Sequence, residues 1–101
     1  MKKLEVIDFY ASWCVNCRLL DPVFNELIME NKSKRGLIIR KKDVDISLEA
    51  VDKYDIMAVP MIIMEKDGKV VERIHGVRTK DQLQDLIDKY YEENETIPQD
   101  I

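Results

Sequence analysis

Hydrophobic and polar positions change their spacing from block to block along the chain, and each block predicts one element. Residues 4–10 are mostly β-branched and aromatic, which favours a strand. From Cys14 to Met29 the apolar residues fall three and four positions apart, which predicts a helix, and Pro22 inside it predicts a bend rather than a break. A second strand is expected over 37–42. Two strands joined by a helix form a crossover unit, so these strands should be parallel.

The second half of the chain predicts a short helix and then a hairpin. Ser47 is placed to cap a helix that ends near residue 54. Pro60 precedes a strand expected over 61–65, and Asp67-Gly68 is a strong signal for a tight turn. The strand after this turn, expected over 69–75, should therefore be antiparallel to the strand before it.

The last part of the chain predicts an amphipathic helix and a polar tail. Thr79 and Gln82 have the spacing of a capping box. The apolar stripe that follows consists of Leu83, Leu86, Ile87, Tyr90 and Tyr91. We expect one domain over 1–93 and a polar C-terminal tail over 94–101. The resulting order is β-α-β-α-β-β-α, an α/β fold with one four-stranded mixed sheet flanked by helices.

Composition narrows the classes of protein that fit this pattern. A chain of 101 residues has room for one domain, and its formal net charge of −4 argues against nucleic-acid binding. No apolar run approaches the roughly 20 residues that span a bilayer. Glu5 and Asp8 interrupt the stretch after Lys2 and Lys3, so we expect no secretory signal. The expectation is a cytoplasmic monomer with neither nucleic-acid nor membrane partners.

The two cysteines, Cys14 and Cys17, stand where the first strand passes into the first helix. Unpaired N–H groups and the positive end of the dipole at a helix N-terminus stabilise a thiolate, so Cys14 should ionise more readily than a free cysteine. Cys17 follows one turn later, within reach of a disulfide. This asymmetry predicts that Cys14 attacks a substrate disulfide and that Cys17 then resolves the mixed disulfide.

The residues around this pair resemble the thioredoxin family. The segment Asp-Phe-Tyr-Ala-Ser-Trp-Cys at 8–14 is similar to the strand end that carries the family's redox site. Further matches, in the same order along the chain, are the helix-bending Pro22, Lys41, the Val59-Pro60 dipeptide and Gly76. The resemblance covers roughly residues 6–90 and implies a thioredoxin-like fold. Because the family usually has one more strand and helix before Asp8, we expect four strands rather than five and a size nearer to glutaredoxin.

The resemblance also implies roles for individual residues. Asp8 would be a buried carboxyl group that accepts the proton of Cys17, and Lys41 would tune it, because burial raises the pKa of Asp8 and a nearby cation lowers it. The residues implied to contact substrate are Trp13, Val59, Pro60 and Gly76, with a cis peptide bond before the proline. The resemblance implies no bound cofactor, protein disulfides as substrates and an electron donor of the thioredoxin-reductase type.

Several alternatives stay open at the level of sequence. Val15-Asn16 replaces the family's Gly-Pro between the cysteines, so the reduction potential, and with it the choice between reductase and oxidase or isomerase, is not fixed. A second class is a metal-binding module, including a dimer that shares an iron–sulfur cluster through Cys14. A zinc site normally needs four ligands, and the one histidine, His75, lies in a distant strand. A third class is an interaction module in which the cysteines are only a structural pair.

Overall fold

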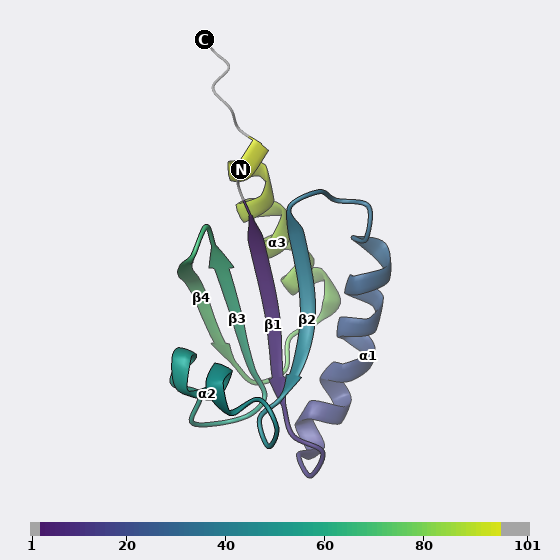
Figure 1. The fold of residues 1–101 in the computed structure, drawn as a ribbon. Helices are drawn as coiled ribbons and strands as arrows, with labels where there is room; N and C mark the ends of the chain where they lie inside the picture. Colours follow the sequence, from purple (N-terminus) through teal and green to yellow (C-terminus); the bar gives the residue numbers. More distant parts are fainter. Residues whose placement is uncertain (1–2, 96–101) are drawn as a thin grey trace.

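A computed structural model describes residues 3–95 of the chain (Figure 1). Its elements are β1 (Leu4–Tyr10), α1 (Val15–Glu30), β2 (Leu37–Asp43), α2 (Leu48–Tyr54), β3 (Met61–Lys66), β4 (Lys69–His75) and α3 (Lys80–Glu95). The predicted β-α-β-α-β-β-α order and the α/β class are therefore confirmed. The strands form a four-stranded sheet in the order β2-β1-β3-β4.

The direction in which two consecutive strands pair follows from the connection between them, a helical crossover for parallel strands or a tight turn for antiparallel ones. β1 is parallel to β2, as the α1 crossover requires, and antiparallel to β3. β3 and β4 form the antiparallel hairpin predicted around Asp67-Gly68. Both turn residues have positive φ values, 51° and 86°, the combination that a two-residue hairpin turn of the right twist requires.

Alternation along β1 divides the core between the two faces of the sheet. Leu4 and Val6 pack against α1 and α3, whereas Ile7 and Phe9 belong to a separate cluster with Tyr54 of α2. Figure 1 shows the same layers, with α2 in front of the sheet and α3 behind it. Because successive side chains of a strand point to opposite faces, Asp8 lies on the face of Leu4 and Val6, under α1.

The ends of the helices agree only in part with the predicted caps. Thr79 and Gln82 form a reciprocal capping box: the Gln82 N–H donates to Thr79 Oγ1 at 3.1 Å, and the Thr79 N–H donates to Gln82 Oε1 at 3.0 Å. Ser47 occupies the N-cap position of α2, but its side chain makes no capping hydrogen bond within the described residues. The helix α3 continues to Glu95, past the expected boundary at 93, and residues 96–101 of the expected tail lie outside the described residues.

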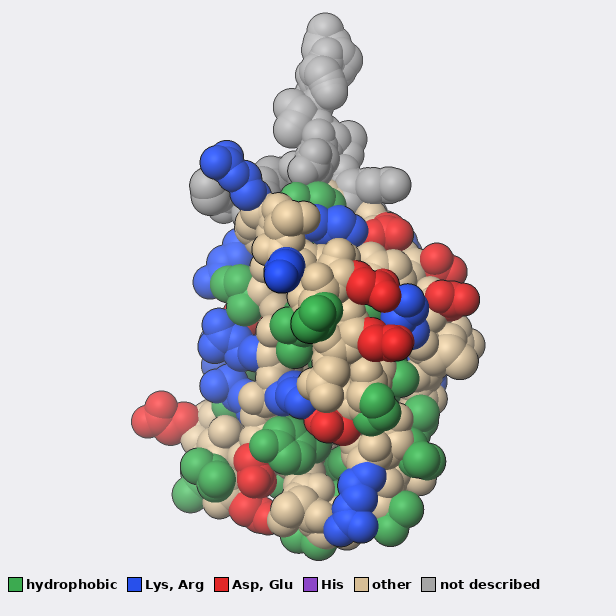
Figure 2. Space-filling view, turned by 90° about the vertical axis from the view of Figure 1, so that its right-hand side faces the viewer, with side chains coloured by type: hydrophobic (Ala, Val, Ile, Leu, Met, Phe, Trp, Pro, Cys, Tyr) green, Lys and Arg blue, Asp and Glu red, His purple; other side chains and the backbone are tan. Residues whose placement is uncertain are grey.

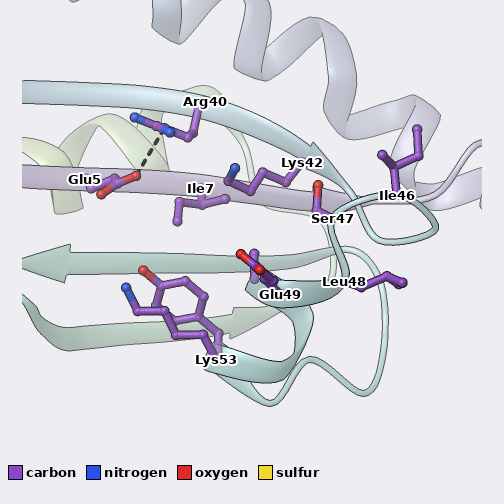
Figure 3. A pocket seen from close by; sticks show the side chains of 11 residues that line it. Glu5, Ile7, Arg40, Lys42, Ile46, Ser47, Leu48, Glu49 and Lys53 are labelled. Carbon is purple, nitrogen blue, oxygen red and sulfur yellow. Dashed lines mark ion pairs between the residues drawn. The ribbon is translucent and has the colours of Figure 1, made fainter.

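The short helix α2 covers only one end of its face of the sheet. Beside it is an open hollow of about 540 Å³, lined by side chains of β1, β2 and α2 (Figure 3). An ion pair of 3.1 Å between Arg40 and Glu5 crosses the strands at its floor. Ile46 and Leu48 stand exposed at its rim. Among residues 3–95, no helix has the length and apolar character needed to cross a membrane.

Candidate active site

Cys14 and Cys17 form a disulfide at the start of α1. Cys14 is the N-cap residue, with an extended backbone, and its Sγ accepts a hydrogen bond of 3.2 Å from the N–H of Cys17. The first N–H groups of a helix have no partner within the helix, so this sulfur satisfies one of them. The same donor and the helix dipole stabilise negative charge on the Cys14 sulfur once the disulfide is reduced.

The disulfide is buried against three separate segments. Cys14 is 8% exposed and Cys17 is 4% exposed, and both pack in a small cluster with Ala11, next to Tyr10, Val44 and Val59. The Val59–Pro60 peptide bond is cis. The carbonyl oxygen of Pro60 accepts a hydrogen bond of 3.0 Å from the Gly76 N–H, and Gly76 has a φ of 102°, a conformation that favours glycine. The fold therefore brings the segments of Val59, Pro60 and Gly76 to the end of the sheet where the cysteines lie.

Trp13 precedes the disulfide and is 65% exposed, so it is not a core residue. Its indole N–H donates a hydrogen bond of 3.0 Å to Asp45 Oδ2, from the loop after β2. Trp13 and Val59 also line an apolar cavity of about 240 Å³, together with the highly exposed Met57. No role for Asp45 follows from the sequence, because nothing in the local pattern shows that this loop returns to the strand end of β1.

Exposed apolar side chains gather around the disulfide. Those on the adjoining segments are Trp13, Val15, Leu19, Met57 and Val77. Figure 2 views the molecule from the α1 side and shows hydrophobic side chains at its lower end, where α1 begins. Exposed apolar groups that cluster in this way are typical of a surface that contacts another macromolecule.

Asp8 is the buried carboxyl group of the site, at 1% exposure. The pKa of Asp8 is raised from its ordinary 3.8 to about 7, chiefly by burial and also by the negative charge of Asp21, while the positive charge of Lys41 acts to lower it. These are the directions expected for burial and for Lys41. Asp8 Oδ1 accepts no hydrogen bond from any residue that the structure describes.

Lys41 is the register partner of Asp8 on the neighbouring strand, but its ammonium group points to other partners. The Nζ donates to Asp21 Oδ1 at 2.7 Å and to Asn25 Oδ1 at 2.8 Å, both on α1. Lys41, Asp21 and Cys17 line one cavity of about 410 Å³, which also includes Arg18 and residues 10–12.

Asp21 and Asn25 are functional candidates that were not among the residues predicted from the sequence. A usable signal was present, because they lie four and eight residues after Cys17 and therefore share one line along α1 with it. Polar side chains are common on exposed helix surfaces, so their type alone does not mark a functional residue. Among the described residues, no group of three or more His, Cys, Asp or Glu side chains could hold a metal ion.

Comparison with known proteins gives one consistent result. Residues 1–89 match the family model described as thioredoxin. The thioredoxin of Listeria monocytogenes is 39% identical over 87 residues, which cover 86% of this chain and 82% of that protein. The thioredoxin of Staphylococcus aureus strain Mu50 is 33% identical over the same coverage.

Solved structures give the same result. Fasciola hepatica thioredoxin is similar with a TM-score of 0.75 and 36% identity, and the match covers 86% of this chain and 80% of that one. Oxidised mitochondrial thioredoxin 3 from Saccharomyces cerevisiae has a TM-score of 0.73 and 30% identity, with 86% and 78% of the two chains covered.

Proposed function

Because this chain belongs to the thioredoxin family, we propose that Cys14 is the nucleophile and Cys17 the resolving thiol of its reaction. Family membership makes the protein a thiol–disulfide oxidoreductase that acts on protein disulfides, and the metal-binding alternative is not favoured. The observation that carries the assignment of roles is the hydrogen bond from the Cys17 N–H to the Cys14 sulfur at the N-cap of α1.

The cycle starts from the reduced pair. The Cys14 thiolate attacks one sulfur of a protein disulfide, which forms a Cys14–substrate bond, breaks the substrate disulfide and releases the first substrate sulfur as a thiolate that takes up a proton. Cys17 then loses its proton and attacks the Cys14 sulfur. The internal disulfide forms, the mixed disulfide breaks, and the second substrate sulfur leaves. Two electrons have passed from the Cys14–Cys17 pair to the substrate.

Asp8 is proposed to accept the proton of Cys17 in the second step. A general base is most effective when its pKa is near the working pH, and burial raises the pKa of Asp8 to about 7. Lys41 tunes this group by lowering its pKa. The cavity that borders Cys17 and Lys41 supports a route for the proton on this side of the disulfide.

Substrate is proposed to dock on the exposed apolar surface around the disulfide. Trp13 provides a flat ring at its edge, and the backbone of Val59 and Pro60 pairs with an extended substrate segment, as in strand addition. Gly76 adds no side chain of its own to the facing side of this groove, where Arg78 Nη1 lies 3.6 Å from the position that a Cβ would take. A groove of this kind recognises backbone shape more than a particular side chain, which suits many protein substrates.

We further propose a monomer that works in the cytoplasm without a bound cofactor. Members of this family act through their disulfide, and an electron donor of the thioredoxin-reductase type would return the pair to the dithiol. The chain is acidic and has only two cysteines, which supports a location in a compartment that keeps thiols reduced.

A trapping experiment tests the assignment of the two cysteines. Cys14→Ser should abolish reduction of a protein disulfide such as that of insulin, whereas Cys17→Ser should accumulate a covalent complex with the substrate that dithiothreitol releases. Full turnover by Cys14→Ser, or complexes formed by Cys14→Ser instead of Cys17→Ser, would overturn the assignment. Equilibration of the wild-type pair in glutathione buffers gives the potential and hence the direction of the reaction.

The role of Asp8 needs its own test. Asp8→Asn should slow resolution of the mixed disulfide, and the rate should lose the rise with pH that the wild-type protein shows near pH 7. An unchanged pH–rate profile would remove Asp8 from the mechanism.

A further inference from the structure

Two residues of α1 hold the ammonium group of Lys41. Asp21 and Asn25 are one helical turn apart, so their side chains lie side by side, and both oxygens accept hydrogen bonds from Lys41 Nζ, at 2.7 Å and 2.8 Å. An ammonium group has three N–H donors. Two of the three are therefore committed to α1.

Asp8 is the residue that this arrangement deprives of a partner. It is paired in register with Lys41 on the adjacent parallel strand, so the two side chains leave the sheet on the same face. No hydrogen bond or ion pair between them occurs within residues 3–95, and Asp8 Oδ1 is buried without a hydrogen bond there. The cation that stands nearest to Asp8 along the sheet is turned toward α1 instead.

We propose that Asp21, assisted by Asn25, is a positioning residue that holds the Lys41 ammonium group against α1, in the wall of the cavity beside Cys17, and so sets how readily Asp8 takes up a proton. The proposal rests on the proposed role of Asp8 in the reaction. It assigns to Asp21 an effect exerted through Lys41, with no contact to substrate or to either sulfur.

The groups that surround Asp8 leave Asp21 and Lys41 as the two residues that control its ionisation. From β2 the neighbour in register is Lys41, and from β3 it is the apolar Ile62. From α3, the buried residues on this face, Leu83 and Ile87, are apolar. From α1, the charged side chains that line the cavity beside Cys17 are Asp21 and Arg18. The Arg18 guanidinium group donates a hydrogen bond to the Ser12 carbonyl oxygen. Asp21 and Lys41 are thus the two charges that act on Asp8, and they act in opposite directions.

Asp21 works in two ways that an experiment can separate. Its own negative charge opposes ionisation of Asp8, and its hydrogen bond prevents Lys41 from approaching Asp8. If Asp21 is replaced by Asn, the charge disappears and the ammonium group is held less firmly. Both changes make the carboxylate form of Asp8 more favourable, and only the second requires Lys41.

A double-mutant cycle on the full chain tests the proposal. The Asp8 carboxyl carbon is titrated by ¹³C NMR in the oxidised wild-type protein, in Asp21→Asn, in Lys41→Gln and in the double variant. The midpoint should fall by about one pH unit in Asp21→Asn, the size expected when a cation can approach a buried carboxylate. In the Lys41→Gln background the same replacement should lower the midpoint by clearly less. Asn25→Ala should give a smaller fall than Asp21→Asn.

Glu26→Gln is the matched control, because it removes one negative charge from an exposed position of the same helix without touching Lys41. It should leave the midpoint of Asp8 unchanged. Equal shifts from Asp21→Asn in both backgrounds would show that Asp21 acts only as a charge and would overturn the positioning role. No shift at all would overturn the proposal completely.

A failure of the positioning role of Asp21 can be distinguished from a failure of the proposed catalytic role of Asp8. The carboxyl titration reports on Asp21 whether or not Asp8 takes part in catalysis, whereas the pH–rate profile of Asp8→Asn reports on Asp8 alone. If Asp8 is the base, the pH–rate profile of Asp21→Asn should shift in the same direction and by the same amount as its carboxyl titration.

Discussion

The indole N–H of Trp13 donates a 3.0 Å hydrogen bond to Oδ2 of Asp45, although most of the Trp13 side chain is exposed. The bond joins the segment before the disulfide to the loop after β2. It fixes the orientation of a ring that would otherwise rotate freely in solvent. A flat apolar surface beside the reactive sulfur is thereby prepared before a substrate arrives.

Asp45→Ala should loosen this ring without altering the disulfide. Loss of a hydrogen bond of about 1 kcal/mol predicts a loss of about fivefold in kcat/KM for a protein disulfide, with little change for a small disulfide that does not reach the ring. Trp13 is the only tryptophan, so fluorescence anisotropy reports its mobility directly. Asp52→Ala, which removes an exposed carboxylate from α2, is the control. Unchanged anisotropy in Asp45→Ala would contradict the prediction.

Asp8→Asn should change how stability depends on pH. The pKa of Asp8 is about 7 in the folded protein and near 3.8 when unfolded, so between these values the native state binds more protons. The group therefore destabilises the fold progressively as pH rises from about 4 to about 7, by up to about 4 kcal/mol. Asp8→Asn removes this penalty.

Urea unfolding of the wild type and Asp8→Asn from pH 4 to pH 8 measures the difference. The variant should be the more stable protein at pH 8, and its advantage should shrink toward pH 4. The exposed Asp85→Asn serves as the control for loss of a carboxylate. A difference that is the same at every pH would show that Asp8 titrates normally in the fold.

The N-cap position of Cys14 predicts early ionisation of its thiol. In reduced Cys17→Ser, where Cys14 is the only thiol, the ultraviolet absorbance of the thiolate should appear at a lower pH than the value of about 8.5 typical of free cysteine. The N–H that donates to the sulfur and the helix dipole are the cause. A titration midpoint equal to that of free cysteine would remove the electrostatic basis of the mechanism.

Thr79→Ala should destabilise the start of α3. The Gln82 N–H loses its acceptor, which costs about 1 kcal/mol for an N-cap of this type. Thr79→Ser retains the hydroxyl group and should restore most of the loss. Urea unfolding at one pH measures both variants, and equal stability of Thr79→Ala and the wild type would show that the capping box contributes nothing.

The fold could be predicted from the sequence wherever a short local motif is compatible with only one backbone conformation. The positive-φ turn at Asp67-Gly68 fixes the hairpin, so the limits of β4 agree with the prediction. The capping box at Thr79 fixes the start of α3 for the same reason. Ser47 shows the limit of such signals, because a capping residue type does not determine where its side chain turns.

The candidate site could be predicted only as far as it depends on local position. The place of Cys14 at a strand–helix junction needs no tertiary information. The partner of Lys41 does need it, because the choice between Asp8 and Asp21 depends on how α1 lies across β1 and β2. Sequence spacing shows that Asp21 shares a helix line with Cys17, but not that the side chain of another strand reaches it.

The hollow of Figure 3 opens on the face of the sheet opposite to Asp8 and Lys41. The sheet separates these two faces, so a substitution in the hollow can be designed without altering the side chains on the face of Asp8 and Lys41. A tether or an immobilisation tag grafted beside Glu49 and Lys53 would lie on the opposite face of the sheet from the cavity that Asp21 and Lys41 line.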